Sequence, residues 1–225
     1  MVGISTDRLR GYCAAVEFRL LGRFEVVHDG KRLSGLRRRE RLLLAVLLLK
    51  DGCGVTVDQL LSLLWDSDPP ARGRVVVQTY VSLIRGALAT LGGDASGVTL
   101  ERAPSGYLLT VERDAVDAHR FRHLVEAARA SADPRERSKL VDEALQLWRG
   151  PPIADASEPL RAHLCARLEE LRQYAVEMRI ESELALGRHS ELIGELTELV
   201  AQFPLSERLI GFDMLALARS GRRHD

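Results

Sequence analysis

Short stretches of alternating apolar and polar residues stand near the start of the chain. Residues 16–21 and 23–28 place apolar side chains at nearly every second position, which is the period of a β-strand with one buried face. The dipeptide Asp29-Gly30 that follows is a preferred two-residue hairpin turn. A third short strand at about residues 31–33 can pair back onto the second. The pattern predicts a small antiparallel sheet.

Leucine-rich segments predict two helices after this sheet. Residues 40–50 are apolar on most sides of a helical wheel, which is typical of a buried helix, and two glycines follow them. Residues 57–65 carry a single apolar stripe, and Thr56 stands at the N-cap position of that helix. Residues 66–70 end in two consecutive prolines, which cannot continue a helix, and therefore predict a loop.

A third helix, over about residues 72–91, has the strongest amphipathic pattern in the first half. Its apolar side carries Val77, Tyr80, Val81, Ile84, Leu88 and Leu91. Residues 98–111 follow as two apolar strands around Pro104-Ser105-Gly106, the pattern of a β-hairpin. The order of two helices, a third helix and a hairpin is that of a winged helix, which lays its third helix in the major groove of DNA.

The second half of the chain is helical throughout. We expect helices at about residues 118–131, 134–148, 158–186, 189–202 and 205–220. Gly187 and Gly221 are 34 residues apart, and each follows an Ala- and Leu-rich helix end. That period is typical of tetratricopeptide-type helix pairs.

The expected fold class is therefore an α+β winged helix-turn-helix domain followed by an all-α tetratricopeptide-like domain. The expected boundaries are a disordered leader over residues 1–15, the winged helix over residues 16–112 and the helical domain over residues 117–225. The last helix pair is expected to be truncated at its C-terminus.

The polar side of the third helix carries side chains that suit a DNA groove. Arginine can bond guanine and glutamine can bond adenine in bidentate fashion, while serine and threonine can serve bases or phosphates. The same polar side would also occur on any amphipathic surface helix. The candidate DNA-binding residues are Arg74, Gln78, Ser82 and Arg85 at the centre, Arg72 and Thr79 at the flanks, and Arg102 in the hairpin.

The chain has no net charge, but six of the residues from Lys31 to Arg41 are basic and one is acidic. Such a run is either a solvated surface or a phosphate-binding one. Because the run abuts the candidate DNA reader, the phosphate candidates are Arg38, Arg39 and Arg41.

Other classes of protein find little support in the sequence. Three widely spaced cysteines without a CxxC pair indicate free thiols, and no nucleotide-binding, nucleophile-elbow or metalloprotease motif occurs. His119 and His123 are four residues apart but lack a third ligand. The longest apolar run, over residues 42–49, is too short for a bilayer. We expect no enzyme activity, no metal, no cofactor and no membrane partner, and a cytoplasmic, nucleoid-associated location in a bacterium.

Several motifs resemble one bacterial family. The first half, with RLLLAVLLLKDG, VDQLLSLLWDSDPP, QTYVSLIRGAL and APSGYLL, is similar to OmpR/PhoB-type winged helices, and more closely to those of the Streptomyces antibiotic regulatory protein (SARP) family. The second half, with DAHRFRHLVEAAR, ALQLWRGPPIAD and FPLSERL, resembles that family's bacterial transcriptional activation domain.

The resemblance implies a transcriptional activator of a secondary-metabolite gene cluster. It implies binding to direct repeats at the promoter −35 element beside a second protomer, and recruitment of RNA polymerase holoenzyme through the σ factor and the α subunit. Asp66 and Asp68, in the loop before the third helix, are the expected σ contacts. The chain departs from the family at Leu83 and Gly86, where arginines are usual, so fewer phosphate contacts are expected. The alternatives are a tetratricopeptide-type scaffold whose winged helix does not bind DNA, and a repressor that occludes the promoter.

Overall fold

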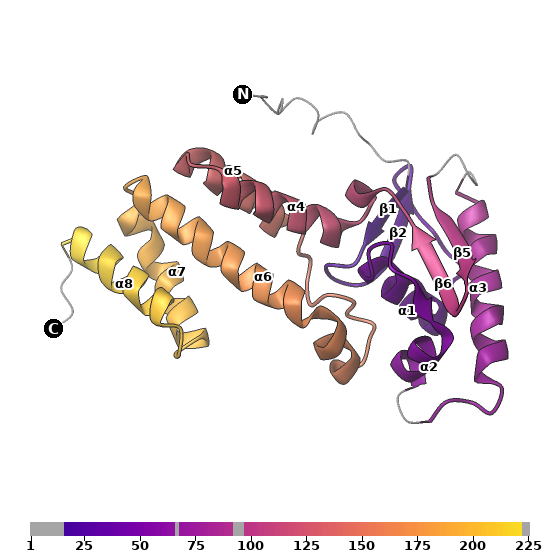
Figure 1. The fold of residues 1–225 in the computed structure, drawn as a ribbon. Coiled ribbons are helices and arrows are strands. Elements are labelled where there is room, and N and C mark those ends of the chain that lie inside the picture. The colour runs from indigo at the N-terminus through magenta and orange to yellow at the C-terminus, as the bar shows by residue number, and fades with distance from the viewer. Residues whose placement is uncertain (1–15, 66–67, 92–96, 222–225) are drawn as a thin grey trace. The chain divides into compact units, whose positions relative to one another are not determined.

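The computed structural model describes residues 16–65, 68–91 and 97–221 (Figure 1). The chain forms two compact units. The first contains the residues up to Arg120 together with Arg149–Leu164, and the second contains Phe121–Trp148 and the residues from Cys165 onward. The expected leader, residues 1–15, lies outside the described residues.

A three-stranded antiparallel sheet begins the first unit, in the order β1 (Val16–Arg19), β2 (Glu25–His28) and β3 (Lys31–Arg32). The turn between β2 and β3 has positive φ at both central residues, 48° at Asp29 and 75° at Gly30. A two-residue turn with this geometry matches the right-handed twist of paired strands. The predicted sheet and its Asp-Gly turn are confirmed.

Helix α1 (Arg38–Leu49) is buried on nearly every side, because every residue from Leu42 to Leu48 is buried. At its N-terminus the backbone N–H of Arg37 donates to the carboxylate of Glu40 at 2.7 Å. This bond pairs a backbone donor at the start of the helix and gives the buried Glu40 side chain a partner. The prediction of a buried helix here is confirmed.

Helices α2 (Val57–Trp65) and α3 (Gly73–Ala89) follow. The backbone N–H of Gln59 donates to Thr56 Oγ1 at 3.1 Å, and the backbone N–H of Thr56 donates to Gln59 Oε1 at 3.0 Å. This reciprocal capping box confirms Thr56 as the cap of α2 and extends it to Gln59. The helix bounds agree closely with the sequence pattern.

The hairpin after α3 consists of β5 (Thr99–Ala103) and β6 (Gly106–Thr110). The two-residue strand β4 (Val55–Thr56) pairs with β6, which gives the sheet order β4-β6-β5. The sequence pattern predicts the hairpin but not β4. Through β4, the hairpin is joined to the start of α2.

Up to residue 221, where the described part ends, the second half contains a short 3-10 helix and five α-helices. Their bounds are η3 Arg113–Ala115, α4 Asp117–Ala130, α5 Pro134–Gln146, α6 Glu158–Ala185, α7 His189–Gln202 and α8 Glu207–Arg219. One buried apolar cluster joins the end of α6 to α7 and α8 through Leu184, Leu196 and Leu209. Gly187 and Gly221 have φ of 85° and 71°, each just after a helix. Within the described ranges, no helix is long and apolar enough to cross a bilayer.

The segment Arg149–Leu164 is built into the first unit by backbone hydrogen bonds. Arg149 N–H donates to Leu21 O at 2.8 Å, and Ile153 N–H donates to Leu20 O at 2.8 Å. A third bond runs from the N–H of Ala154 to the carbonyl of Gly22 at 3.0 Å. Residues from beyond α5 therefore complete the turn between β1 and β2.

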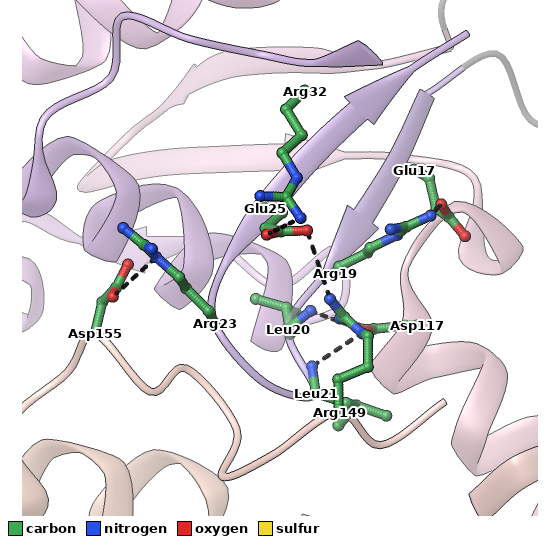
Figure 2. A network of polar contacts seen from close by, with 10 residues as sticks. All are labelled: Glu17, Arg19, Leu20, Leu21, Arg23, Glu25, Arg32, Asp117, Arg149 and Asp155. Carbon is green, nitrogen blue, oxygen red and sulfur yellow. Dashed lines mark hydrogen bonds and ion pairs between the residues drawn. The ribbon is translucent and has the colours of Figure 1, made fainter. Parts of the chain in front are cut away.

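A buried carboxylate strengthens this connection (Figure 2). Asp117 accepts from the backbone N–H groups of Leu20 at 2.7 Å and Leu21 at 3.0 Å, and from Arg149 Nη2 at 2.7 Å. Burial raises the pKa of Asp117 and outweighs these donors, each of which lowers it. Asp117 thus holds the β1–β2 turn and Arg149 together.

Candidate nucleic-acid interface

One side of α3 forms part of the core of the first unit. Val77 and Ile84 are fully buried, and Val81 and Leu88 are 1% and 6% exposed. The ring of Tyr80 stacks on Trp65 of α2, with centroids 6.0 Å apart. The predicted apolar side of α3 is confirmed, and the opposite side is left at the surface.

The exposed side of α3 contains a polar ridge, which we define as Arg74, Gln78, Ser82 and Gly86. These residues are four apart, so they form one row along the helix, and all four are exposed. Three of them are candidate DNA-binding residues, and the fourth is a glycine. Three of the four central candidates are therefore exposed on one row, and the fourth, Arg85, is exposed beside it.

A second exposed row, which we call the methyl ridge, consists of Val75, Thr79 and Leu83. Val75 is 56% exposed and Leu83 is 49% exposed. The hydroxyl of Thr79 donates to the backbone carbonyl of Val75 at 3.0 Å. Only Thr79 was singled out from the sequence. The four-residue spacing of Val75 and Leu83 on the non-core side is the signal that could have identified them.

The two arginines at the edge of the exposed side are both held by neighbouring elements. Arg74 Nη2 lies 2.7 Å from Asp58 Oδ1 of α2, and both side chains are largely exposed. Arg85 Nε donates to the backbone carbonyl of Leu100 in β5 at 2.9 Å. Since that bond uses one of the five N–H groups of Arg85, it fixes the guanidinium beside the hairpin and leaves the other donors for a ligand.

The two remaining flanking candidates, Arg72 and Arg102, are both exposed. Arg72 is exposed at the N-cap of α3. Arg102 is exposed on β5, opposite Tyr107 of β6. Strands β5 and β6 are drawn alongside α3 (Figure 1), in agreement with the bond from Arg85 to Leu100.

The three phosphate candidates all have partners inside the first unit. Arg38 Nε donates to the carbonyl of Asp155 at 2.9 Å, and Arg41 Nη2 lies 3.1 Å from the carboxylate of Asp155. The guanidinium of Arg39 lies 5.1 Å from the ring centroid of Trp65, a cation–π distance. The contacts of Arg38 and Arg41 attach the loop that contains Asp155 to the start of α1. Contact of the three arginines with phosphate remains a prediction.

Of the two expected σ contacts, Asp66 lies outside the described residues. Asp68 is exposed at the rim of a groove of about 570 Å³ in the first unit. Arg39, Trp65 and His163 also line this groove. In the described ranges, no group of three His, Cys, Asp or Glu residues is placed to hold a metal ion.

The family description "Bacterial transcriptional activator domain" matches residues 116–225. Regulatory protein DnrI of Streptomyces peucetius is 34% identical over 92% of this chain and 79% of its own length. Regulatory protein AfsR of Streptomyces griseus is 35% identical over 93% of this chain, which spans only 21% of AfsR.

A solved structure has the same architecture. Mycobacterium tuberculosis EmbR, in complex with a low-affinity phosphopeptide, superposes with a TM-score of 0.83 at 31% identity, covering 92% of this chain and 56% of the EmbR chain. That likeness supports a winged helix with small sheets followed by a helical domain. Together with the match to most of DnrI, it shows that the chain belongs to the Streptomyces antibiotic regulatory protein family of transcriptional regulators.

Proposed function

We propose that this protein is a sequence-specific activator that binds double-stranded DNA with α3 in the major groove. The observation that carries the proposal is the polar ridge, an exposed row on a helix whose other side is firmly packed in the core. A helix fixed in this way can present its side chains without a costly rearrangement. Membership of a family of transcriptional regulators supports DNA as the ligand of this surface.

The polar ridge and the arginines around it would divide the work of recognition. Gln78 and Ser82 reach base edges, and Arg74 joins them once it leaves Asp58. Arg85, held beside the hairpin, would contact the sugar-phosphate backbone. The flanking contacts are made by Arg72 and Thr79 at the helix and by Arg102 in the wing.

We further propose that two protomers bind direct repeats beside the −35 element of a secondary-metabolite promoter. The protein would act in the cytoplasm, on the nucleoid. Asp66 and Asp68 would contact a basic surface of the σ factor, since acidic side chains favour such a partner. The helical half, with tetratricopeptide-like repeats, would contact the α subunit of RNA polymerase.

Binding of the full chain to promoter fragments, across a salt series, tests the first part of the proposal. We expect footprints over direct repeats for the native protein. Combined Arg74→Ala and Arg85→Ala changes should weaken binding at least tenfold and lower the slope of log K against log salt by up to about two. The matched control combines Arg129→Ala and Arg135→Ala, two exposed arginines of the helical half, and should leave both quantities unchanged.

Absence of DNA binding at low salt by a folded protein would favour the scaffold alternative. If the protein binds, transcription in vitro from the footprinted promoter separates the remaining two possibilities. Activation is expected, with loss of activation but retention of binding in an Asp66→Ala and Asp68→Ala variant. A fall in transcript with rising protein would instead identify a repressor.

A further inference from the structure

We propose that the methyl ridge, Val75, Thr79 and Leu83, reads the C5-methyl groups of thymines in the major groove. The inference rests on the proposed function and makes it specific, because it names which base edges the row beside the polar ridge would recognise. Two rows of one helix would then read different features, hydrogen-bonding edges by the polar ridge and thymine methyls by the methyl ridge.

Exposure is the first observation. Val75 and Leu83 are 56% and 49% exposed, although α3 already buries four aliphatic side chains on its core side. They are not needed to hold the helix in place.

The hydrogen bond of Thr79 is the second observation. Its hydroxyl proton is donated to the carbonyl of Val75, within the same helix. The hydroxyl proton is thereby used within the helix, and the methyl group of Thr79 adds apolar surface to the row between Val75 and Leu83. In the major groove, thymine is distinguished by its C5-methyl group, and apolar contact is how that group is recognised.

The spacing of the row sets a geometric expectation. Val75 and Leu83 are eight residues apart, which is about 12 Å along a helix. Base pairs are stacked at about 3.4 Å, so this length corresponds to three or four steps. The thymines read by the row should fall within about four base pairs of one another in each repeat.

A protein partner fits this surface less well than DNA. The methyl ridge is only one side chain wide, and beside it run the polar ridge with Arg74 and, at the helix start, Arg72. Cations and polar groups so close to the apolar row favour a ligand that offers phosphates, polar edges and methyl groups together. Duplex DNA has all three in one groove.

The test uses the full chain and begins by selecting its preferred site from a random duplex library. Each thymine of that site is then replaced, one at a time, by deoxyuridine, which lacks only the C5-methyl group. We expect one or more replacements to weaken binding about fourfold each, the effect of losing one buried methyl. Replacements outside the contacted steps should have no effect.

Variants then assign the contact. Val75→Ala and Leu83→Ala should each weaken binding to thymine DNA about fourfold or more, and should lose most of that effect on the matching deoxyuridine DNA. Because both side chains are exposed and alanine favours helices, the variants should fold, which thermal unfolding checks. Leu205→Ala is the matched control, since Leu205 is 93% exposed on the helical half.

The outcomes test the proposed function and the thymine contact of the methyl ridge separately. Failure of the library to yield any bound sequence would overturn the proposed function. Selected binding that is unchanged by every deoxyuridine, and by both ridge variants, would overturn the thymine inference alone. In that case a protein partner, and not DNA, would be the expected ligand of the methyl ridge.

Discussion

The ion pair between Arg74 and Asp58 engages a side chain that the proposed DNA interface uses. Its 2.7 Å contact lies at the surface, where solvent screening keeps such pairs weak, so DNA can compete for the arginine. The acid itself would then lie close to phosphates. At the scale of single residues, we therefore expect Asp58 to oppose the proposed binding of DNA.

Replacing Asp58 by asparagine should tighten DNA binding several-fold. The change frees Arg74 and removes a charge that repels phosphate, at a cost of about 0.5 kcal/mol from the start of α2. The dissociation constant for a selected site, measured by fluorescence anisotropy, checks the expectation. Glu126→Gln, an exposed change in α4, controls for net charge. Weaker binding by Asp58→Asn would show that the acid instead orients Arg74.

Gly106 permits the close approach of β6 to β4. A Cβ at this position would lie 1.9 Å from the carbonyl oxygen of Val55 and 2.7 Å from Thr56 Cα. Gly106→Ala should therefore lower the free energy of unfolding by about 3 kcal/mol, because backbone must move. Chemical denaturation measures the loss. Gly194→Ala in α7, where an added Cβ meets no atom within 4 Å, should be neutral or stabilising.

The carboxylate of Glu183 titrates below its ordinary pKa. Burial raises its pKa, but the hydroxyl of Ser138, at 2.6 Å, and the guanidinium of Arg188, at 2.7 Å, together lower it by more. Since the folded pKa is below the unfolded one, ionised Glu183 stabilises the fold above about pH 4.5, and this contribution is lost as the pH falls.

Glu183→Gln should consequently cost about 1–2 kcal/mol of unfolding free energy at neutral pH and less at acid pH. Urea unfolding of both proteins at neutral pH and again below pH 4.5 gives the comparison. A cost that stays constant or grows on acidification would contradict the lowered pKa.

At the scale of elements, the helices follow from local signals and the strand β4 does not. Periodic apolar positions, the cap at Thr56 and the glycines after helices are all contained within a few consecutive residues, so they mark each helix directly. Strand β4 is two residues long, and its partner Gly106 is fifty residues later. No local pattern records that pairing.

The candidate site shows the same division between local and distant information. The helical period was enough to predict the exposed side of α3, including Gln78 and Ser82. The partners of the arginines were not predictable, because Asp58, Leu100 and Asp155 come from other segments. The run of basic residues predicted phosphate contacts, but its sequence held no sign of the partners that Arg38, Arg39 and Arg41 have within the fold.

At the scale of the whole molecule, the chain passes between its two compact units more than once. The first unit takes in Asp117 and the segment Arg149–Leu164, both beyond the boundary expected from the sequence at residue 112. Residues of the second half of the chain therefore belong to the first compact unit. A protein that ends at residue 112 would lack the partners of the β1–β2 turn.

Asp117→Ala should lower the stability of the first unit by about 3 kcal/mol, because two buried N–H groups lose their acceptor. Trp65 and Trp148 belong to different units, so Trp148→Phe leaves a fluorescence probe in the first unit alone. In that background, Asp117→Ala should shift the denaturation midpoint of Trp65 downward. Glu126→Ala serves as the surface control, and an unshifted midpoint would mean that the turn holds without the carboxylate.

The late origin of these partners has a consequence for synthesis. Asp117 follows Leu20 by 97 residues, and Asp155 follows Arg41 by 114 residues. At bacterial elongation rates of about 5–20 residues per second, the newly made N-terminal strands wait roughly 5–25 s for their contacts. During that interval the backbone N–H groups of Leu20 and Leu21 lack their carboxylate acceptor. We therefore expect the β1–β2 turn to reach its native structure only after translation has passed the segment that contains Asp155.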